Sequence, residues 1–434
     1  MPVHAYARGG ASRRPTAPRR QALRHVAFSA AAGVSGAIAA TAATLALDVA
    51  SCLSHRWSWL LFALPLLGVA SIGLFRLLKL PLGVQPGSVV EDVRNDDRVP
   101  PALAPAALVG TFFTVLGGGS AGATATSLAM ASSAASGLGR AFGLAPRGAK
   151  AHRLVHRGWT AACGMAAACS ALYGAPLAGT LFPLELVRFD GAVARRLPIL
   201  LGASFVAWLV AMPLAGGYAL PAAAAPDPSW QVAALCVLVG LACAAAGTVF
   251  GWALRALRRA FVRSPAHPAL VVAAGGAVVS VLVFAFGWQR FEGSGLTLVY
   301  AAFDGTSEPF DFAVKALLTT VTLGFGFKGG EVMPSLCIGA LLGASFAALL
   351  GVDPSFAAAM GSVAFFAAAA RCPLAAVLLA AETFGWAVAP WAALAVFPAY
   401  MGSTDVGMFG RGLTGRLSRA KRTARDKRRR EKER

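Results

Sequence analysis

Two charged residues interrupt an apolar segment, and they are the first candidates for chemistry. The segment FGFKGGEVMPSLCIGALLGASF, Phe325 to Phe346, places Lys328 and Glu331 three residues apart around a Gly-Gly pair. An acid in a membrane-like segment is a functional candidate, because its charge is costly to bury without a partner or a role. Glu331 could therefore carry protons, or it could form an ion pair with Lys328 that only fixes the loop.

The glycines and the proline beside these charges indicate a break between helices. Gly329 and Gly330 let the backbone turn and let a ligand approach it closely. Pro334 suits the first turn of a helix, where its missing N–H leaves no bond unmade. The first N–H groups of a helix lack partners, and together with the helix dipole they favour an anion. The segment therefore predicts an anion site near Gly330–Met333.

The elements that must position these residues are apolar helices. Of the 434 residues, 57% are hydrophobic and only 13% are charged, which is typical of a polytopic membrane protein and not of a soluble domain. Several apolar windows approach the roughly 20 residues that span a bilayer core. Others are short or broken by Gly and Pro. Non-helical backbone cannot face lipid, so Gly324–Met333 must line a cavity or lie inside the protein.

Most of the net charge of +20 lies in the two tails. Residues 1–25 carry six Arg and no acid, and residues 411–434 carry twelve Lys or Arg and three acids. By the positive-inside rule we expect cytoplasmic basic tails at 1–25 and 405–434, and a cytoplasmic loop at Arg255–Arg263. The tails could also contact anionic lipid. Nothing supplies the ordered basic face that nucleic acid requires, so we expect no nucleic-acid partner.

The cysteines and histidines do not form a metal or redox pattern. The seven Cys have no CxxC spacing and most lie in apolar segments. His152 and His156 are four residues apart, but Lys150, Arg153 and Arg157 surround them and would repel a cation. No nucleophile–base pair and no phosphate loop stands out. We therefore expect no metal, no cofactor and no enzymatic activity.

Three motifs recur in the same order. GGSAGATATSL and GFKGGEVMPSL align with Gly122 over Gly330, and PGSVVED pairs with EGSGLTL. APLAGTLFPLELV and CPLAAVLLAAETF both run Pro-Leu-Ala, with Glu185 and Glu382 each nine residues after the Pro. These matches predict two homologous halves, about 26–190 and about 196–390, within a transmembrane domain at 26–404. We expect the two glutamates to satisfy helix ends or subunit contacts, and Gly339 and Gly343 to serve close helix packing.

Taken together, these motifs resemble the CLC family of chloride channels and anion/proton antiporters. GFKGGEVMPSLCIGALLG resembles its Gly-Gly-x-x-x-Pro anion motif, and GAPLAGTLFPLEL resembles its Pro-Leu-Ala-Gly motif. LVGTFFTVLGGGSAG resembles the approach to the gating helix. The Glu of Gly-Gly-Glu-Val-x-Pro is more like the fluoride/proton antiporter branch than the chloride branch. The resemblance covers roughly residues 83–400.

The resemblance implies an all-α membrane protein with two inverted-topology repeats and with broken and re-entrant helices. It also implies a homodimer with one pore per subunit, multi-pass in a bacterial inner membrane. In this family, helix N-termini hold the anion, with a hydroxyl or amide from a Gly-Ser segment and often an aromatic from the last helix. Carried over by position, the anion-binding residues are Gly87, Ser88, Gly122, Ala123, Thr124, Ala125, Gly330, Glu331, Val332 and Met333.

The sequence departs from the family at functional positions. The gating segment reads GATAT, so the gating glutamate falls on Thr124. Leu186 stands where the chloride branch places its inner proton-pathway glutamate, and Met333 stands where the fluoride branch has Thr. The opening of the first motif is Gln-Pro-Gly-Ser at 85–88. Three residues are candidates for the last-helix aromatic: Phe397, Tyr400 and Phe409.

These departures leave three functional hypotheses. The first is channel-like transport of a halide, chloride or fluoride, because Thr124 cannot act as a charged gate. The second is a fluoride/proton antiporter in which Glu331 transfers the proton. The third is a family member that no longer conducts.

Overall fold

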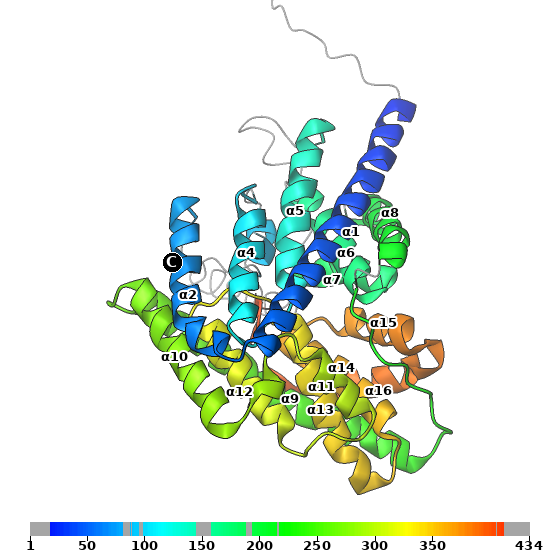
Figure 1. The fold of residues 1–434 in the computed structure, drawn as a ribbon. Helices are drawn as coiled ribbons and strands as arrows, with labels where there is room; N and C mark the ends of the chain where they lie inside the picture. Colours follow the sequence, from blue (N-terminus) through cyan, green and yellow to red (C-terminus); the bar gives the residue numbers. More distant parts are fainter. Residues whose placement is uncertain are drawn as a thin grey trace, which may run out of the picture.

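The computed structural model describes residues 18–80, 87, 89–94, 99–144, 158–187, 193–214, 217–404 and 406–411, and this part is built from α-helices (Figure 1). Two 3-10 turns, η3 and η4, and one two-stranded hairpin, β1–β2, complete it. The elements in chain order are α1 (Pro18–Arg56), α2 (Leu60–Leu77), α3 (Val89–Arg94), α4 (Leu103–Leu116), α5 (Thr124–Ala141), α6 (Trp159–Tyr173), α7 (Pro176–Leu186), α8 (Val193–Leu214), α9 (Trp230–Arg263), α10 (Pro268–Phe286), η3 (Gln289–Phe291), α11 (Leu296–Phe303), α12 (Asp311–Gly324), α13 (Val332–Leu350), α14 (Pro354–Ala370), α15 (Pro373–Phe384), η4 (Trp386–Val388), α16 (Ala389–Gly402), β1 (Val406–Gly407) and β2 (Gly410–Arg411).

Among the described residues, five helices are long and apolar enough to cross a membrane. These helices keep large apolar side chains exposed; Trp252 and Phe284, for example, are 62% and 64% exposed. Such surface is unfavourable in water, whereas lipid tails solvate it. The candidate spans are Arg20–Arg56, Leu60–Leu77, Arg196–Leu214, Trp230–Arg263 and Pro268–Phe286.

Other apolar helices are too short to cross. Helices α4, α7, α12 and α15 contain 14, 11, 14 and 12 residues. At about 1.5 Å of rise per residue they fall short of a core about 30 Å thick. Their ends must therefore find hydrogen-bond partners inside the protein. The prediction of broken helices is confirmed.

Small residues let the central helices approach one another closely. Every residue of α6 is buried, and so is every residue of α14 from Phe356 onward. A Cβ on Gly339 would lie 2.3 Å from the Gly361 carbonyl oxygen, and one on Gly343 would lie 2.1 Å from that of Ala357. Both distances are too short for any side chain, so these glycines permit the contact between α13 and α14. Their predicted packing role is confirmed.

The segment Arg255–Arg263 is helical, which corrects the prediction of a loop. It forms the C-terminal end of α9, and Arg255 anchors the β-hairpin by donating from Nη1 to the Gly407 carbonyl at 2.7 Å. Four arginines in nine residues suggested a solvated loop. A long helix can nevertheless end in arginines, because their aliphatic stems cover apolar surface while the guanidinium groups reach polar partners.

The two repeat-related glutamates cap each other's helices. The Glu185 carboxylate, at the end of α7, accepts hydrogen bonds from Leu374 and Ala375 N–H at 3.0 and 2.8 Å, at the start of α15. The Glu382 carboxylate, at the end of α15, accepts from residues 177 and 178 of α7 at 2.9 and 2.8 Å. Each acid satisfies orphan N–H groups and lies at the positive end of a helix dipole. The expectation that these acids satisfy helix ends is confirmed.

Replacing Glu382 by Ala should lower the melting temperature of the detergent-purified protein by several degrees. The change leaves two N–H groups of α7 without acceptors, and a hydrogen bond to a charged group contributes about 1.5–3 kcal/mol. Glu308→Ala is the control, because Glu308 is 74% exposed and such ion pairs contribute about 0–1 kcal/mol. Equal melting temperatures for the two variants would contradict the capping role.

Candidate anion-binding site

The starts of α5 and α13 meet at two glycines. Gly122 N–H donates to the Gly330 carbonyl at 2.9 Å, and Gly330 N–H donates to the Gly122 carbonyl at 2.9 Å. The sequence aligned these two glycines as equivalent positions of two motifs, and the structure places them in direct contact. The N–H groups of both glycines are occupied by this bridge, so in this structure their role is to hold the two helix starts together.

Only glycine allows the helix starts to come this close. A Cβ on Gly330 would lie 2.7 Å from the Ala125 nitrogen and 2.9 Å from the Gly122 oxygen. A Cβ on Gly122 would lie 2.9 Å from that of Met333. The neighbours of Gly330 are backbone atoms, which cannot rotate away as a flexible side chain could. The backbone of one helix start therefore lies directly against the N–H groups of the other.

Buried N–H groups at these helix starts lack acceptors, and four of them belong to the first two residues of α5 and of α13. Within the described part of the chain, no hydrogen-bond acceptor faces the amides of Thr124 and Ala125 in α5 or of Val332 and Met333 in α13. All four residues are at most 1% exposed. A buried donor without a partner costs about 1–3 kcal/mol. An anion between the helices would satisfy these donors, and both helix dipoles would favour its negative charge.

Two tyrosine hydroxyls contact the predicted gate segment. Ala123 N–H donates to Tyr218 Oη at 2.8 Å, and Thr124 Oγ1 lies 2.7 Å from Tyr173 Oη. Thr124 is fully buried. Its side chain is thus held by a neutral hydrogen bond at the position where the resemblance to the CLC family implies a carboxylate.

Glu331 pairs with an arginine from another helix. Its carboxylate lies 3.4 Å from both Nη1 and Nη2 of Arg258, near the C-terminal end of α9, and the Glu331 side chain is 1% exposed. The alternative interpretation paired Glu331 with Lys328. In the described part of the chain the cation of this ion pair is Arg258, while Lys328 Nζ lies 4.4 Å from the centre of the Phe75 ring.

The predicted Gly-Ser segment approaches Glu331 at Gly87. A Cβ on Gly87 would lie 3.3 Å from Glu331 Oε1 and 3.4 Å from Phe409 Cε1. Ser88 lies outside the described residues. Among the three aromatic candidates, Phe409 is thus the one that borders a predicted site residue; it lies in the β1–β2 turn after α16. Phe397 is 68% exposed, and the Tyr400 ring packs against the Arg371 guanidinium at 3.8 Å.

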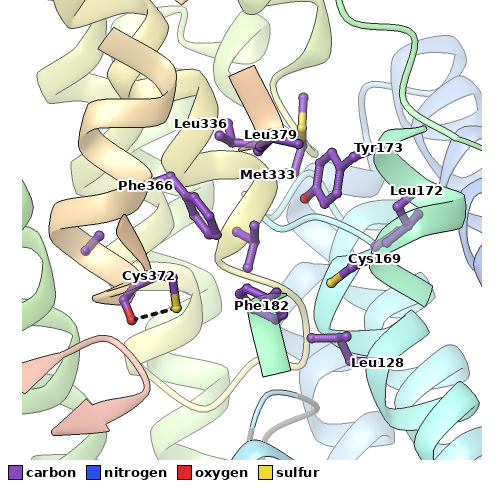
Figure 2. Close-up of a cluster of buried hydrophobic side chains, with 14 of the residues drawn as sticks. Leu128, Cys169, Leu172, Tyr173, Phe182, Met333, Leu336, Phe366, Cys372 and Leu379 are labelled. Carbon is purple, nitrogen blue, oxygen red and sulfur yellow. Dashed lines mark hydrogen bonds between the residues drawn. The ribbon is translucent and has the colours of Figure 1, made fainter. Parts of the chain in front are cut away.

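An apolar cluster adjoins the helix starts (Figure 2). Tyr173 and Phe366 lie on opposite sides of it, and Phe182 stacks with Phe366 at a centroid distance of 5.9 Å. A cavity of ≈ 20 Å³, lined by these three residues and by Val332 of α13, lies among them. It is large enough for one water-sized particle. The start of α13 therefore borders a small apolar cavity.

The structure brings the described site residues together and adds three that the sequence did not indicate. All the predicted positions except Ser88 lie at the two helix starts or beside Glu331. The missed residues are Arg258, Tyr173 and Tyr218. The signals available were weak: the chain has only five Tyr, one of them directly before the GAPLAG motif, and Arg258 lies among four arginines after an apolar run.

Comparison with known proteins agrees with the fold. The model of the voltage gated chloride channel family matches residues 67–404. The chloride/fluoride channel protein of Pseudomonas syringae pv. tomato is 31% identical over 401 residues, which cover 88% of this chain and 85% of that protein. The crystal structure of a CLC-type fluoride/proton antiporter superposes with a TM-score of 0.82 at 25% identity, covering 91% of this chain and 98% of that one. A slow cyanobacterial Cl⁻/H⁺ antiporter superposes with a TM-score of 0.75 at 20% identity, covering 94% and 99%.

The chain therefore belongs to the voltage gated chloride channel, or CLC, family. It is an all-helical, multi-pass integral membrane protein with the CLC fold. This is a family of channels and transporters and not of enzymes.

Replacing Gly330 by Ala should reduce halide flux in proteoliposomes at least tenfold. The added methyl group meets backbone atoms of α5 at 2.7 Å and must push the two helix starts apart. Gly73→Ala is the matched control, because a Cβ at Gly73 meets nothing within 4 Å. Wild-type flux in a correctly folded Gly330→Ala variant would contradict the site.

Proposed function

We propose that this protein carries a halide, chloride or fluoride, across the membrane between the starts of α5 and α13. The observation that carries this proposal is the set of four buried N–H groups without acceptors at Thr124, Ala125, Val332 and Met333. A halide accepts hydrogen bonds from several directions and has the charge that both helix dipoles favour. The family, and the halides named for its members, support the same conclusion.

We propose further that the transport is channel-like. A carboxylate at the gate can compete with the anion for N–H groups and can carry a proton. The neutral hydroxyl of Thr124 does neither, and it is held by Tyr173. Leu186 stands at the position of the chloride branch's inner glutamate, and its apolar side chain cannot carry a proton either. The relative from Pseudomonas syringae pv. tomato is named a channel, which supports this mechanism.

Coupled exchange of fluoride and protons is the second candidate. Glu331 is a buried acid at the start of α13, beside Gly87 and Phe409, and a solved structure of similar fold is a fluoride/proton antiporter. To carry protons, this carboxylate must either leave the ion pair with Arg258 or be protonated within it. The antiporter mechanism therefore requires that the Glu331–Arg258 ion pair opens, or that its carboxylate loses its charge, during each cycle.

The assembly is also part of the proposal. The Gly122–Gly330 bridge and the reciprocal caps of Glu185 and Glu382 are contacts that two halves related by inverted topology would make. We propose that the chain comprises such halves, about 26–190 and about 196–390, within a domain at 26–404. The basic tails at 1–25 and 405–434 are cytoplasmic, and the protein is a homodimer in a bacterial inner membrane.

Halide efflux from proteoliposomes distinguishes the three hypotheses. Chloride and fluoride release is recorded with ion-selective electrodes. A potassium ionophore is added so that potassium can leave with the anion and no membrane potential stops the release. The external pH is followed at the same time. Passive release without proton movement supports the channel, and release that drives protons supports the antiporter. No release of either halide from vesicles containing folded protein would mean that the chain does not conduct.

Glu331→Gln separates the first two hypotheses at a single residue. If the protein is a channel, the passive halide flux of Glu331→Gln should stay within about threefold of wild type, and neither protein should move protons. Arg258→Gln is the matched variant, because it breaks the same ion pair and leaves the carboxylate in place. Proton movement that is present in wild type and in Arg258→Gln, but lost in Glu331→Gln, would contradict the channel mechanism.

Thr124→Glu should give the protein an acid-activated flux. The new carboxylate would lie beside unpaired N–H groups of α5, which would favour its charged form and let it compete with the anion. Flux should fall at neutral pH and recover toward pH 4, as protonation removes the competing charge. Wild type should respond far less over pH 4–8 at this position, because a Thr hydroxyl does not change charge. Identical pH profiles would mean that Thr124 does not line the pathway.

A further inference from the structure

Two tyrosines stand beside the start of α5: Tyr173 holds the Thr124 hydroxyl, and Tyr218 has no role in the proposed channel. Tyr173 ends α6, and Tyr218 lies in the connection between α8 and α9. Their ring centroids are 5.7 Å apart with the planes tilted by 35°. Tyr173 is 7% exposed, and Tyr218 is half-buried. Because both hydroxyls reach the first residues of α5, the pair is part of the surroundings of the candidate site.

Tyr218 occupies one of the N–H groups that an anion would use. Its hydroxyl oxygen accepts from Ala123 N–H at 2.8 Å, and it lies 3.4 Å from the place where a Cβ on Gly122 would stand. The N–H groups of the next residues, Thr124 and Ala125, have no acceptor in the described part of the chain. The Tyr218 hydroxyl therefore satisfies the first of three successive N–H groups, and the other two have no acceptor in the described part of the chain.

The backbone of the α8–α9 connection fixes where this hydroxyl lies. Tyr218 N–H donates to the Leu172 carbonyl at 2.7 Å, and a Cβ on Gly217 would lie 2.7 Å from the Ala171 oxygen. One residue further, the Ala219 carbonyl accepts from Tyr300 Oη at 2.8 Å. The connection is thus held against the end of α6, and the ring of Tyr218 is directed to α5 by contacts on both sides.

The tyrosine pair stands between an open cleft and the interior. A cleft of ≈ 240 Å³ is lined by both tyrosines together with Trp208 and Met212 of α8. Tyr173 also lines the ≈ 20 Å³ cavity beside Val332 of α13. Tyr173 therefore lies between the cleft and this cavity, and the Tyr218 hydroxyl lies beside it at the start of α5.

We propose that Tyr218 is the gate of the pathway on the side of this cleft. Its neutral hydroxyl holds the Ala123 N–H in place of an anion, and an arriving halide must displace it. This inference rests on the proposed function, because a gate requires a pathway. The displaced bond is neutral and modest, which lets the halide compete without protonation of any group.

The test is halide efflux and halide binding in Tyr218→Phe, with Tyr300→Phe as control. Tyr218→Phe removes the hydroxyl and keeps the ring, so efflux should rise about two- to tenfold, the factor that corresponds to one lost neutral hydrogen bond. Titration calorimetry of the detergent-purified protein with potassium chloride and potassium fluoride should show tighter apparent binding by a similar factor. Tyr300→Phe removes the hydroxyl that anchors the same connection at Ala219, and it should leave both quantities within twofold.

Each outcome supports or overturns the gate. A rise in Tyr218→Phe alone supports it, including the case in which only the variant conducts. Wild-type efflux that Tyr218→Phe leaves unchanged or lowers overturns the gate and leaves the pathway intact. Equal rises in Tyr218→Phe and Tyr300→Phe overturn it in favour of a loosened connection. A rise confined to Tyr218→Ala, which also removes the ring, assigns the block to the ring and overturns the role of the hydroxyl. No efflux from any folded variant overturns the pathway and the gate together.

Discussion

Backbone polar groups at membrane depth have no water to bond with, and much of this architecture follows from that constraint. A helix that ends inside the membrane leaves its first N–H groups without intrahelical partners. Here the chain satisfies such groups at α7 and α15 with the carboxylates of Glu382 and Glu185. At the starts of α5 and α13 four buried N–H groups have no acceptor in the described part of the chain. The proposed function uses these unpaired N–H groups as the place where an exchangeable anion binds.

The remaining features of the centre make this arrangement possible. Gly122 and Gly330 bring the two uncapped helix starts together, and small residues in α13 and α14 allow the supporting helices to pack closely. The side chains around the site differ between its borders. Tyrosine hydroxyls contact the start of α5, whereas the start of α13 carries the Glu331–Arg258 ion pair. An anion between the two helix starts would therefore have neutral hydroxyls on the α5 side and an ion pair on the α13 side.

Local sequence patterns predicted the features that depend on neighbouring residues in the chain, such as where helices begin and break. Gly, Pro and apolar spacing indicated the broken helices and the anion motif. The alignment made Gly122 and Gly330 equivalent positions of two motifs, and only the structure shows that they are in contact. The partners of Glu331 and Thr124 could not be predicted in the same way. Arg258 is 73 residues from Glu331 along the chain, and Tyr173 is 49 residues from Thr124. Such pairs arise from tertiary packing, which composition and periodicity do not encode. The segment Arg255–Arg263 has the charge that is typical of a loop, but it continues the helical pattern of the apolar run before it, so the prediction of a loop was wrong.

The central claim is that an anion binds to the unpaired N–H groups between α5 and α13. Anomalous diffraction from crystals of the protein grown with bromide would test it directly. Bromide can replace a smaller halide, and its anomalous scattering near its absorption edge locates it in the crystal. The account predicts a bromide peak within about 3.5 Å of the amide nitrogens of residues 124–125 or 332–333, on the order of the distance for an N–H bond to a large anion. Well-occupied bromide elsewhere in the protein, with none between these helix starts, would contradict it.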